Sequence, residues 1–491
     1  MANLYVATTG SDSAAGSLAA PYATIARAAS AAKPGDNVYV RGGTYMPGGT
    51  NQIFIGSKGT ASAHITFQPY NNEKVVLDGT NLAGKDLVSI MGSYVDFGGF
   101  EVRNSQAIGI VLVNASYIRI FNNVVHDNSK LGIAAWGASQ SAWTNVLVEG
   151  NTVYNNVKGY IPTGDNATGG FTGTGFTYGQ NLVFRNNTVY HNYGEGITTD
   201  GVGGSVVIED NTMYDNRSMN IYLMQTSNAV IQRNLLYSLN DTRFYRYGMP
   251  AVGIQIANES THAARASNNT VVNNITYNLR SGFYFGNYAL GGALVNTLVA
   301  NNTFVNSVQA GLWIDSANAG QVHSGSRVMN NVFTQQTNTN TPAMFTASSG
   351  ITFTSNLWHT LGAVPASVKS SSDVYADPKF VVTPSGSTLN FRVQILSPAV
   401  DKGTNVSAIT TDFDQNARVQ NGRTDIGAYE ATPIVAAGGD FNGDGKVNFS
   451  DILVLAANYG KTTATFADGD ANRDGRVDFA DLLVLASKYT G

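Results

Sequence analysis

One pattern occurs twice between residues 181 and 224, and it constrains the fold more than any other feature of the chain. In both copies a short apolar segment leads to Asn-Thr-apolar-Tyr, a polar turn follows, and Gly-Ile or Asn-Ile then opens a second apolar segment. Related copies recur along the chain, with 23 to 40 residues between marker asparagines. The markers are Asn123, Asn151, Asn187, Asn211, Asn234, Asn274, Asn302, Asn331 and Asn356. Repetition at this period is typical of solenoids and arrays.

The apolar segments alternate with the two-residue period of β-strands, and no amphipathic helix separates them. A unit of roughly two dozen residues without a helix cannot bury its apolar side alone, whereas stacked copies share one continuous core. Nine or ten coils at strand spacing, about 4.8 Å each, would form a rod of roughly 45 Å. The repeat therefore predicts an all-β solenoid.

With these repeats, residues 1–432 resemble the pectate-lyase-like superfamily. The resemblance implies a right-handed single-stranded parallel β-helix. It also implies that the marker asparagines form a ladder of amide hydrogen bonds from coil to coil at a sharp turn. We therefore interpret the asparagines as scaffold and not as catalytic groups.

The two ends of this domain differ from the repeat. Residues 1–36 resemble the N-terminal cap of secreted β-helix proteins, and the spacing of Ile25, Ala28, Ala29 and Ala32 predicts a helix that plugs the open end. Residues 361–432 resemble the closing segment that follows bacterial β-helices. Its acidic residues are interpreted as capping and turn residues rather than catalytic ones: Asp401, Asp414, Asp425 and Glu430.

After a linker at 433–439, residues 440–491 contain two EF-hand-type loops thirty residues apart. Oxygen-bearing side chains occupy loop positions 1, 3, 5, 9 and 12, and position 7 would bind through its carbonyl. Each loop runs into an apolar helix. Because both loops carry this set of oxygen ligands, we expect two Ca²⁺ sites. The predicted ligands are Asp440, Asn442, Asp444, Lys446, Asn448, Asp451, Asp470, Asn472, Asp474, Arg476, Asp478 and Asp481.

Paired loops with aspartate at position 12 resemble a type I dockerin. The resemblance implies a helical module that binds a cohesin on a scaffold protein, and a secreted or extracellular location. Positions 10 and 11, Phe449-Ser450 and Phe479-Ala480, depart from the commonest hydroxyl pair. The cohesin partner is therefore open, and a terminal module that is merely folded by calcium is the alternative.

Composition excludes several other classes. The net charge is −4 and 13% of residues are charged, so nonspecific nucleic-acid binding is not indicated. No run of eighteen apolar residues occurs, so no membrane span is expected, and the absence of cysteine excludes disulfides. We expect a monomer.

Two intervals between markers are too long, and their extra residues fall within 158–180 and 240–264. Both follow an Asn-x-x-Tyr strand, so both insertions should leave the rod on the same side. Loops on a rigid scaffold commonly carry binding sites. We expect them to form two walls of a cleft whose floor is coils 187–224.

Stacking aligns equivalent positions, so the columns of the repeat can be compared. Glu195 is the only carboxylate among the residues that precede the second strand, and Asp200 follows on the same coil. The predicted catalytic residues are Glu195, Asp200, Tyr193 and Arg217. The predicted substrate-binding residues are Lys130, Tyr222, Arg280, Tyr284, Phe244, Tyr245 and Arg246. Aromatic rings with convergent polar groups suit sugars, and the cations favour an anionic polysaccharide.

Three functions remain open. A glycoside hydrolase, slightly favoured, needs two carboxylates about 5–5.5 or 6.5–9.5 Å apart. Glu195 and Asp200 could be separated by roughly 16 Å on a straight strand, in which case the partner would come from an insertion, as Asp165, Asp241 or Glu259. A polysaccharide lyase acting on a uronate would instead use a cation or Ca²⁺ and a base. The third possibility is a noncatalytic carbohydrate-binding or adhesion solenoid.

Overall fold

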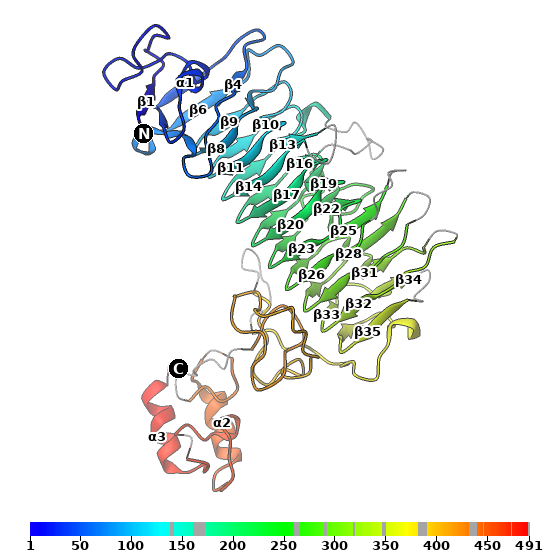
Figure 1. Ribbon diagram of the computed structural model, residues 1–491. Coiled ribbons are helices and arrows are strands. Elements are labelled where there is room, and N and C mark those ends of the chain that lie inside the picture. The colour runs from blue at the N-terminus through cyan, green and yellow to red at the C-terminus, as the bar shows by residue number, and fades with distance from the viewer. Residues whose placement is uncertain are drawn as a thin grey trace.

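The computed structural model has the expected solenoid fold (Figure 1). It describes residues 1–137, 142–160, 172–259, 266–288, 292–317, 320–345, 350–381, 390–431, 439–444, 446–472 and 474–489. Within these residues three parallel sheets run along the rod, and each coil from β2 to β34 contributes one strand to each sheet. None of the described helices is long and apolar enough to cross a membrane.

The first sheet contains thirteen of the described strands, all paired in parallel. In order they are β1 (Asn3–Val6), β2 (Asn37–Val40), β5 (Ile65–Pro69), β8 (Ser93–Gly98), β11 (Ser116–Phe121), β14 (Thr144–Glu149), β17 (Gln180–Arg185), β20 (Gly203–Glu209), β23 (Ala229–Gln232), β26 (Thr270–Val272), β29 (Leu298–Ala300), β32 (Ser326–Met329) and β35 (Ile351–Thr354).

The second sheet contains eleven of the described strands and carries the region of interest for function. They are β4 (Ile53–Ile55), β7 (Val88–Ile90), β10 (Ile110–Val113), β13 (Ile133–Trp136), β16 (Thr172–Thr177), β19 (Glu195–Asp200), β22 (Met219–Met224), β25 (Val252–Asn258), β28 (Ser281–Asn287), β31 (Ala310–Ile314) and β34 (Ala343–Phe345).

The third sheet contains twelve of the described strands, most of them three residues long. They are β3 (Gly43–Tyr45), β6 (Val75–Asp78), β9 (Glu101–Arg103), β12 (Val124–His126), β15 (Thr152–Tyr154), β18 (Thr188–Tyr190), β21 (Thr212–Tyr214), β24 (Leu235–Tyr237), β27 (Ile275–Tyr277), β30 (Thr303–Val305), β33 (Val332–Gln335) and β36 (Leu357–Thr360).

The marker asparagines form the predicted ladder. The Asn187 side-chain amide donates to Oδ1 of Asn211 (3.1 Å), and the Asn211 amide donates in turn to Oδ1 of Asn234 (2.9 Å). The same bonds continue from Asn123 to Asn356. All nine side chains are buried, so each bond satisfies an amide that has no access to water.

A second ladder, which the spacing of the marker asparagines does not predict, lies at the next turn. Its members are Asn128, Asn156, Asn192 and Asn216, linked in that order by amide hydrogen bonds of 2.8–3.1 Å. It ends where the Asn216 amide donates to Oδ1 of Asn220 (2.9 Å). The two ladders fix the two ends of the short third-sheet strands.

The core consists of apolar columns that run along the rod. Ile197, Ile221, Ile254, Phe283 and Leu312 are aligned by strand register and are fully buried. Because the side-chain period of a strand is two, the residues between them face outward. This alternation decides which residues of the second sheet can meet a ligand.

The predicted cap is present as α1 (Ile25–Ala31), which begins at an N-cap bond from the Arg27 N–H to Thr24 Oγ1 (3.1 Å). Ile25, Ala28 and Ala29 pack into the core at the first coil. At the other end the closing segment lies against the flank of the solenoid. The Asn301 amide donates to the carbonyl of Asp425 (3.0 Å), and Ile409 packs with apolar residues of the first sheet.

The acidic residues of the closing segment form their contacts within that segment, in agreement with a capping and turn role. Glu430 is buried and forms an ion pair with buried Arg418 (3.1 Å). Asp425 accepts a bond from the Asp401 N–H (2.7 Å), and Asp414 pairs with exposed Arg392. Short 3₁₀ turns connect other parts of the chain: η1 (Tyr70–Asn72), η2 (Lys158–Tyr160), η3 (Thr242–Phe244), η4 (Ala366–Val368) and η5 (Phe466–Asp468).

The C-terminal module contains two helices, α2 (Phe449–Ala457) and α3 (Phe479–Lys488). Each begins with a capping box whose third residue is the last aspartate of the preceding loop, Asp451 or Asp481. Leu455 and Leu485 pack in one small core. Apart from Gly439, the linker expected at 433–439 lies outside the described residues.

Candidate functional site

A cavity of about 330 Å³ lies on the outward face of the second sheet, over β16, β19 and β22. It contains four of the predicted site residues. Its lining consists of Leu131, Trp136, Gly175, Phe176, Thr177, Glu195, Thr198, Asp200, Met219, Tyr222, Met224, Arg246 and Glu259. The expected floor, coils 187–224, is therefore part of a real cavity.

The strand register explains why these residues meet. Thr198 of β19 pairs with Tyr222 of β22, and Tyr222 pairs with Gln255 of β25. Asp200 pairs with Met224 in the neighbouring outward column. These are the columns expected from the repeat, because parallel stacking in register keeps equivalent residues side by side.

Glu195 begins β19 and faces the cavity. A side chain at Gly196 would collide with the Asn220 carbonyl oxygen, 2.5 Å from an added Cβ, so position 196 must be small. Glu195 is only 4% exposed, and its Oε2 accepts no hydrogen bond from the described residues. Burial raises its pKa to about 7, because a carboxylate is poorly solvated there.

Arg246 enters the same cavity from the loop between β24 and β25. Within that loop the Asp241 carboxylate caps η3, and Phe244 stacks on His191 (4.6 Å between ring centroids). These contacts hold the loop against the coil that carries Glu195. The guanidinium donates to Ser218 Oγ (2.7 Å), while its buried Nε bonds to none of the described residues.

Tyr222 and Glu259 complete the polar lining. The pKa of Tyr222 is raised, first by burial and then by the nearby Glu259 carboxylate, so its hydroxyl remains protonated at neutral pH. Arg246 favours the ionised form of Glu195, whereas Glu259 opposes it. The cavity thus holds one cation, several carboxyl groups and a phenol around a partly apolar surface.

Asp200 lines the cavity but does not pair with Glu195. β19 continues through Asp200 without a turn, so an extended strand separates the two residues by roughly 16 Å. This separation is too long for the two carboxylates of a glycoside hydrolase. The turn at Thr199–Asp200 that such a pair requires is absent.

Arg280 and Tyr284 lie further along the same sheet. Tyr284 pairs with Gln255 on one side and Trp313 on the other, which places it two strands beyond Tyr222. Its hydroxyl donates to Asp315 (2.9 Å), and Arg280 lies 5.4 Å over the Trp313 ring. These predicted binding residues share the face, but not the cavity, with Glu195.

The other predicted residues have different surroundings. Tyr193 packs against Phe244 of this loop (5.0 Å between ring centroids), and Phe244 is buried, so both residues help to hold the loop in place. The Tyr245 hydroxyl donates to the Asn240 side chain (3.2 Å). Arg217 is buried, and exposed Lys130 lies on the turn before β13; neither residue is among those that line the cavity.

The second insertion differs from the expectation in one respect. β25 (Val252–Asn258) lies inside the range expected for it: residues 240–251 form a first loop before this strand, and residues 260–265 after it lie outside the described residues. The first loop carries Arg246, and Glu259 follows β25 directly. Most of the first insertion, including Asp165, lies outside the described residues. Trp136 and Glu259 also line the cavity, although comparison of equivalent positions in the repeat does not select them.

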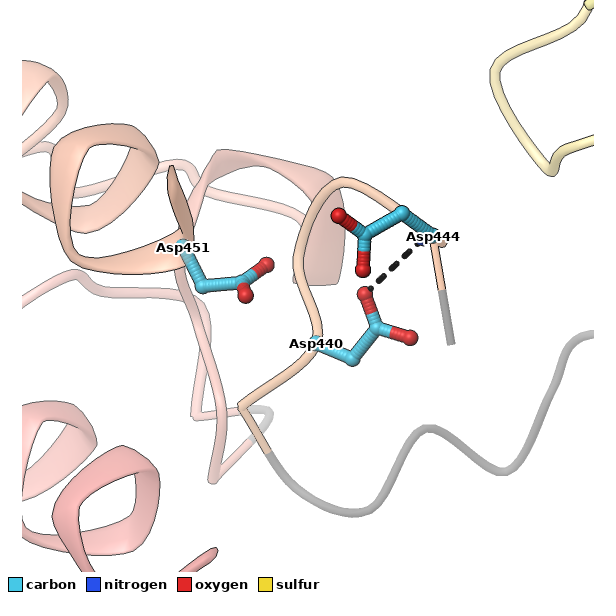
Figure 2. Close-up of side chains that lie close together, drawn as sticks. All are labelled: Asp440, Asp444 and Asp451. Atoms are coloured by element: carbon cyan, nitrogen blue, oxygen red, sulfur yellow. Dashed lines mark hydrogen bonds between the residues drawn. The ribbon is translucent and has the colours of Figure 1, made fainter. Parts of the chain in front are cut away.

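In the C-terminal module, the first EF-hand-type loop brings three carboxylates together (Figure 2). Ligand oxygens of Asp440, Asp444 and Asp451 lie within 4.8 Å of one another, the only such acidic group among the described residues. The Asp444 N–H donates to Oδ1 of Asp440 (3.2 Å). An all-oxygen set of this kind fits Ca²⁺. The second loop repeats the bond between Asp474 and Asp470 (3.1 Å).

Family models match three parts of the chain. One described as a Pel9A-like right-handed β-helix region matches residues 4–234, and one described as a right-handed β-helix region matches residues 171–333. A type I dockerin domain model matches residues 438–488. Together these matches cover the cavity and the two EF-hand-type loops.

Two curated relatives are similar over parts of the chain. Pectate lyase PEL9 of Emericella nidulans is 45% identical over 83 residues, 17% of this chain and 20% of that protein. The uncharacterized protein YwoF of Bacillus subtilis is 26% identical over 49% of this chain and 69% of its own length. The chain thus spans about one fifth of the length of PEL9.

Two solved structures show the same fold over most of the chain. Pectate lyase Pel9A superposes with a TM-score of 0.52 at 21% identity, covering 88% of this chain and 97% of that one. The complex of XylC with xylose gives 0.58 at 14% identity, covering 88% and 98%. The chain therefore combines a Pel9A-like right-handed β-helix, which has pectate lyases among its homologues, with a C-terminal type I dockerin.

Proposed function

We propose that the protein is a polysaccharide lyase that cleaves a uronate-containing glycan by β-elimination in the cavity at Glu195. The similarity to pectate lyase PEL9, at 45% identity over 83 residues, is the observation that carries this proposal. The sequence by itself slightly favours hydrolysis. The homology to lyases, together with the wide separation of Glu195 and Asp200, supports β-elimination better.

The cavity offers groups for each step of this reaction. Arg246 would bind the uronate carboxylate and so acidify the proton at C5. Glu195, once ionised, would take that proton while the electron pair forms the C4–C5 double bond and the C4–O bond breaks. The protonated Tyr222 hydroxyl would give its proton to the departing oxygen. Because the Glu195 pKa is about 7, the carboxylate is a stronger base than an ordinary glutamate.

Product analysis tests the proposal directly. A panel of polyuronates, with polygalacturonate and alginate as the first two, is incubated with the full chain. The proposed reaction yields an unsaturated uronate whose conjugated double bond absorbs in the ultraviolet. Glu195→Gln is the matched inactive control. Reducing ends that appear without this absorbance would contradict β-elimination, and the absence of both products over the panel would favour a noncatalytic binding solenoid.

A glycoside hydrolase remains the second candidate, because the buried Glu195 carboxyl is partly protonated at neutral pH and could act as general acid. Its partner would then be Glu259, whose charge acts on Glu195, and not Asp200. In this case Glu259→Gln would abolish activity as fully as Glu195→Gln.

We further propose that residues 440–491 bind two Ca²⁺ ions and attach the enzyme to a cohesin-bearing scaffold outside the cell. The dockerin match and the carboxylates of Asp440, Asp444 and Asp451 support this assignment. The boundaries 1–432 and 440–491 are proposed on the same basis. Calorimetry with Ca²⁺ should give two binding sites, and a single site would contradict the assignment.

A further inference from the structure

Most arginines in the described part of the chain are neutralised by a nearby carboxylate. The paired residues are Arg41, Arg103, Arg119, Arg185, Arg233, Arg243, Arg392 and Arg418. Arg246 and Arg280 are partly buried, yet neither has a carboxylate within 4.0 Å among the described residues. Both lie on the outward side of the second sheet, where a ligand would meet them.

The two guanidinium groups are anchored two strands apart along the rod. Arg246 is held by Ser218, which directly precedes β22. The Val252 N–H donates to the Ser218 carbonyl (3.0 Å), and the Arg280 N–H donates to the Ala251 carbonyl (2.9 Å). Ser218 and Arg280 therefore occupy equivalent turns separated by two strand spacings, about 10 Å.

Arg280 belongs to an ordered aromatic surface. Its Nε donates to Gln309 (2.5 Å), and its guanidinium lies over the Trp313 ring. Trp313 also contacts Tyr284, with ring centroids 4.7 Å apart. These contacts hold the cation and the indole in place before any ligand arrives.

A polar chain connects this surface to the cavity. The Gln255 amide donates to the Tyr288 hydroxyl (2.9 Å), Tyr288 donates to Tyr284 (3.2 Å), and Tyr284 donates to Asp315. Gln255 stands between Tyr222 and Tyr284 in the outward column, and its buried Oε1 has no partner among the described residues. The outward column from Thr198 to Trp313 is thus continuous.

We propose that Arg280 and Trp313 form a second binding position for an anionic sugar residue. An extended polyuronate chain then lies along the second sheet, parallel to the rod. Arg246 holds one carboxylate at the cavity, and Arg280 holds another about two strands further on. The proposal rests on the proposed function only in taking an anionic polysaccharide as the ligand.

The chemistry of the two residues suits this role. A guanidinium that is not paired with a protein carboxylate can form charge-assisted hydrogen bonds with a ligand carboxylate, while an indole face packs against the C–H face of a sugar ring. A sugar residue in an extended chain advances by about as much as one coil. Two cations two coils apart therefore match carboxylates on alternate residues, which project to the same side of such a chain.

Affinity electrophoresis measures this binding without requiring turnover. The full chain is run through gels containing polygalacturonate or alginate, and Arg280→Gln and Trp313→Ala are compared with Arg327→Gln and Tyr117→Ala. Arg327 and Tyr117 are exposed on the first sheet and serve as matched controls. We expect each test variant to weaken binding of at least one polymer about tenfold, and the controls to bind like the original chain.

Methyl-esterified polygalacturonate separates charge recognition from general contact. The original chain should bind this polymer weakly. Arg280→Gln should weaken that binding no further, because the carboxylate that Arg280 would meet is absent. The proposal would be overturned if Arg280→Gln bound the polymers as strongly as the original chain. It would also be overturned if neither polymer retarded the original chain. The chain could also show no cleavage activity while its retardation in the gel depends on Arg280. This result would refute the proposed function and support the second binding position.

Discussion

Glu195 and Arg246 face one cavity without forming an ion pair. Oε2 of Glu195 and Nε of Arg246 are both buried, and neither has a hydrogen-bond partner among the described residues. Buried polar atoms are normally satisfied, because leaving one unpaired costs about 1–3 kcal/mol. An acceptor and a donor left open in the same cavity are available for hydrogen bonds to a ligand.

Glu195→Gln should abolish activity and raise stability above neutral pH. The folded-state pKa, about 7, is higher than the ordinary 4.5, so the folded protein binds more protons than the unfolded chain between these values. Stability therefore falls as pH rises through this window, by about 3 kcal/mol in total. The amide of the glutamine cannot ionise, so the variant does not lose this stability as pH rises. Urea unfolding at pH 4 and pH 8 should show the advantage of the variant only at pH 8.

The pH dependence of kcat distinguishes the two reactions proposed for Glu195. A base must be ionised, so the rate of β-elimination should rise about tenfold per pH unit below pH 7 and level off above it. A general acid must be protonated, so hydrolysis would give the opposite profile. Tyr222 should not limit the rate at high pH, since burial keeps its pKa raised. A rate that falls above pH 7 would contradict the assignment of Glu195 as base.

Arg246→Gln should lower kcat/KM at least tenfold on an anionic polysaccharide, because it removes the cation that binds the uronate in the cavity. Arg243→Gln is the matched control. Arg243 lies three residues earlier and forms an exposed ion pair with Asp241, whose loss should cost little. Steady-state kinetics with both variants would contradict the role of Arg246 if their losses were equal.

Asn211→Ala should destabilise the solenoid by about 2–3 kcal/mol. The Asn211 side chain donates to Asn234 and to the Phe184 carbonyl and accepts from Asn187, and alanine leaves these buried groups unpaired. Asn186→Gly is the control: Asn186 is exposed with φ of 54°, a conformation that glycine adopts readily. Thermal unfolding followed by circular dichroism should show a clear loss only for the ladder variant.

Removal of Ca²⁺ should unfold α2 and α3 and leave the β-helix intact. Without the ion, the carboxylates of Asp440, Asp444 and Asp451 repel one another, while the β-helix core is separate from this module. Circular dichroism with a chelator should show the loss of helical signal, restored by Ca²⁺. Asp444→Asn should weaken Ca²⁺ binding without changing the β-sheet signal. A helical signal that the chelator does not change would contradict the calcium assignment.

The sequence by itself determined the features that repeat or that are local. The asparagine ladder and the shared column of Thr198 and Tyr222 follow from the period, because stacked coils keep equivalent residues in register. The clustering of Asp440, Asp444 and Asp451 follows equally, since their loop lies within twelve consecutive residues.

Only the tertiary structure decided which residues meet from different coils and loops. Arg246 reaches the cavity because η3 and the stacking of Phe244 on His191 fold its loop back, and loop conformation carries no periodic signal. Arg280 and Glu195 share a face but not a cavity. The straight course of β19, which separates Asp200 from Glu195, likewise depends on pairing with both neighbouring strands. Register is encoded in the repeat, whereas the path of an insertion is set by the contacts it makes.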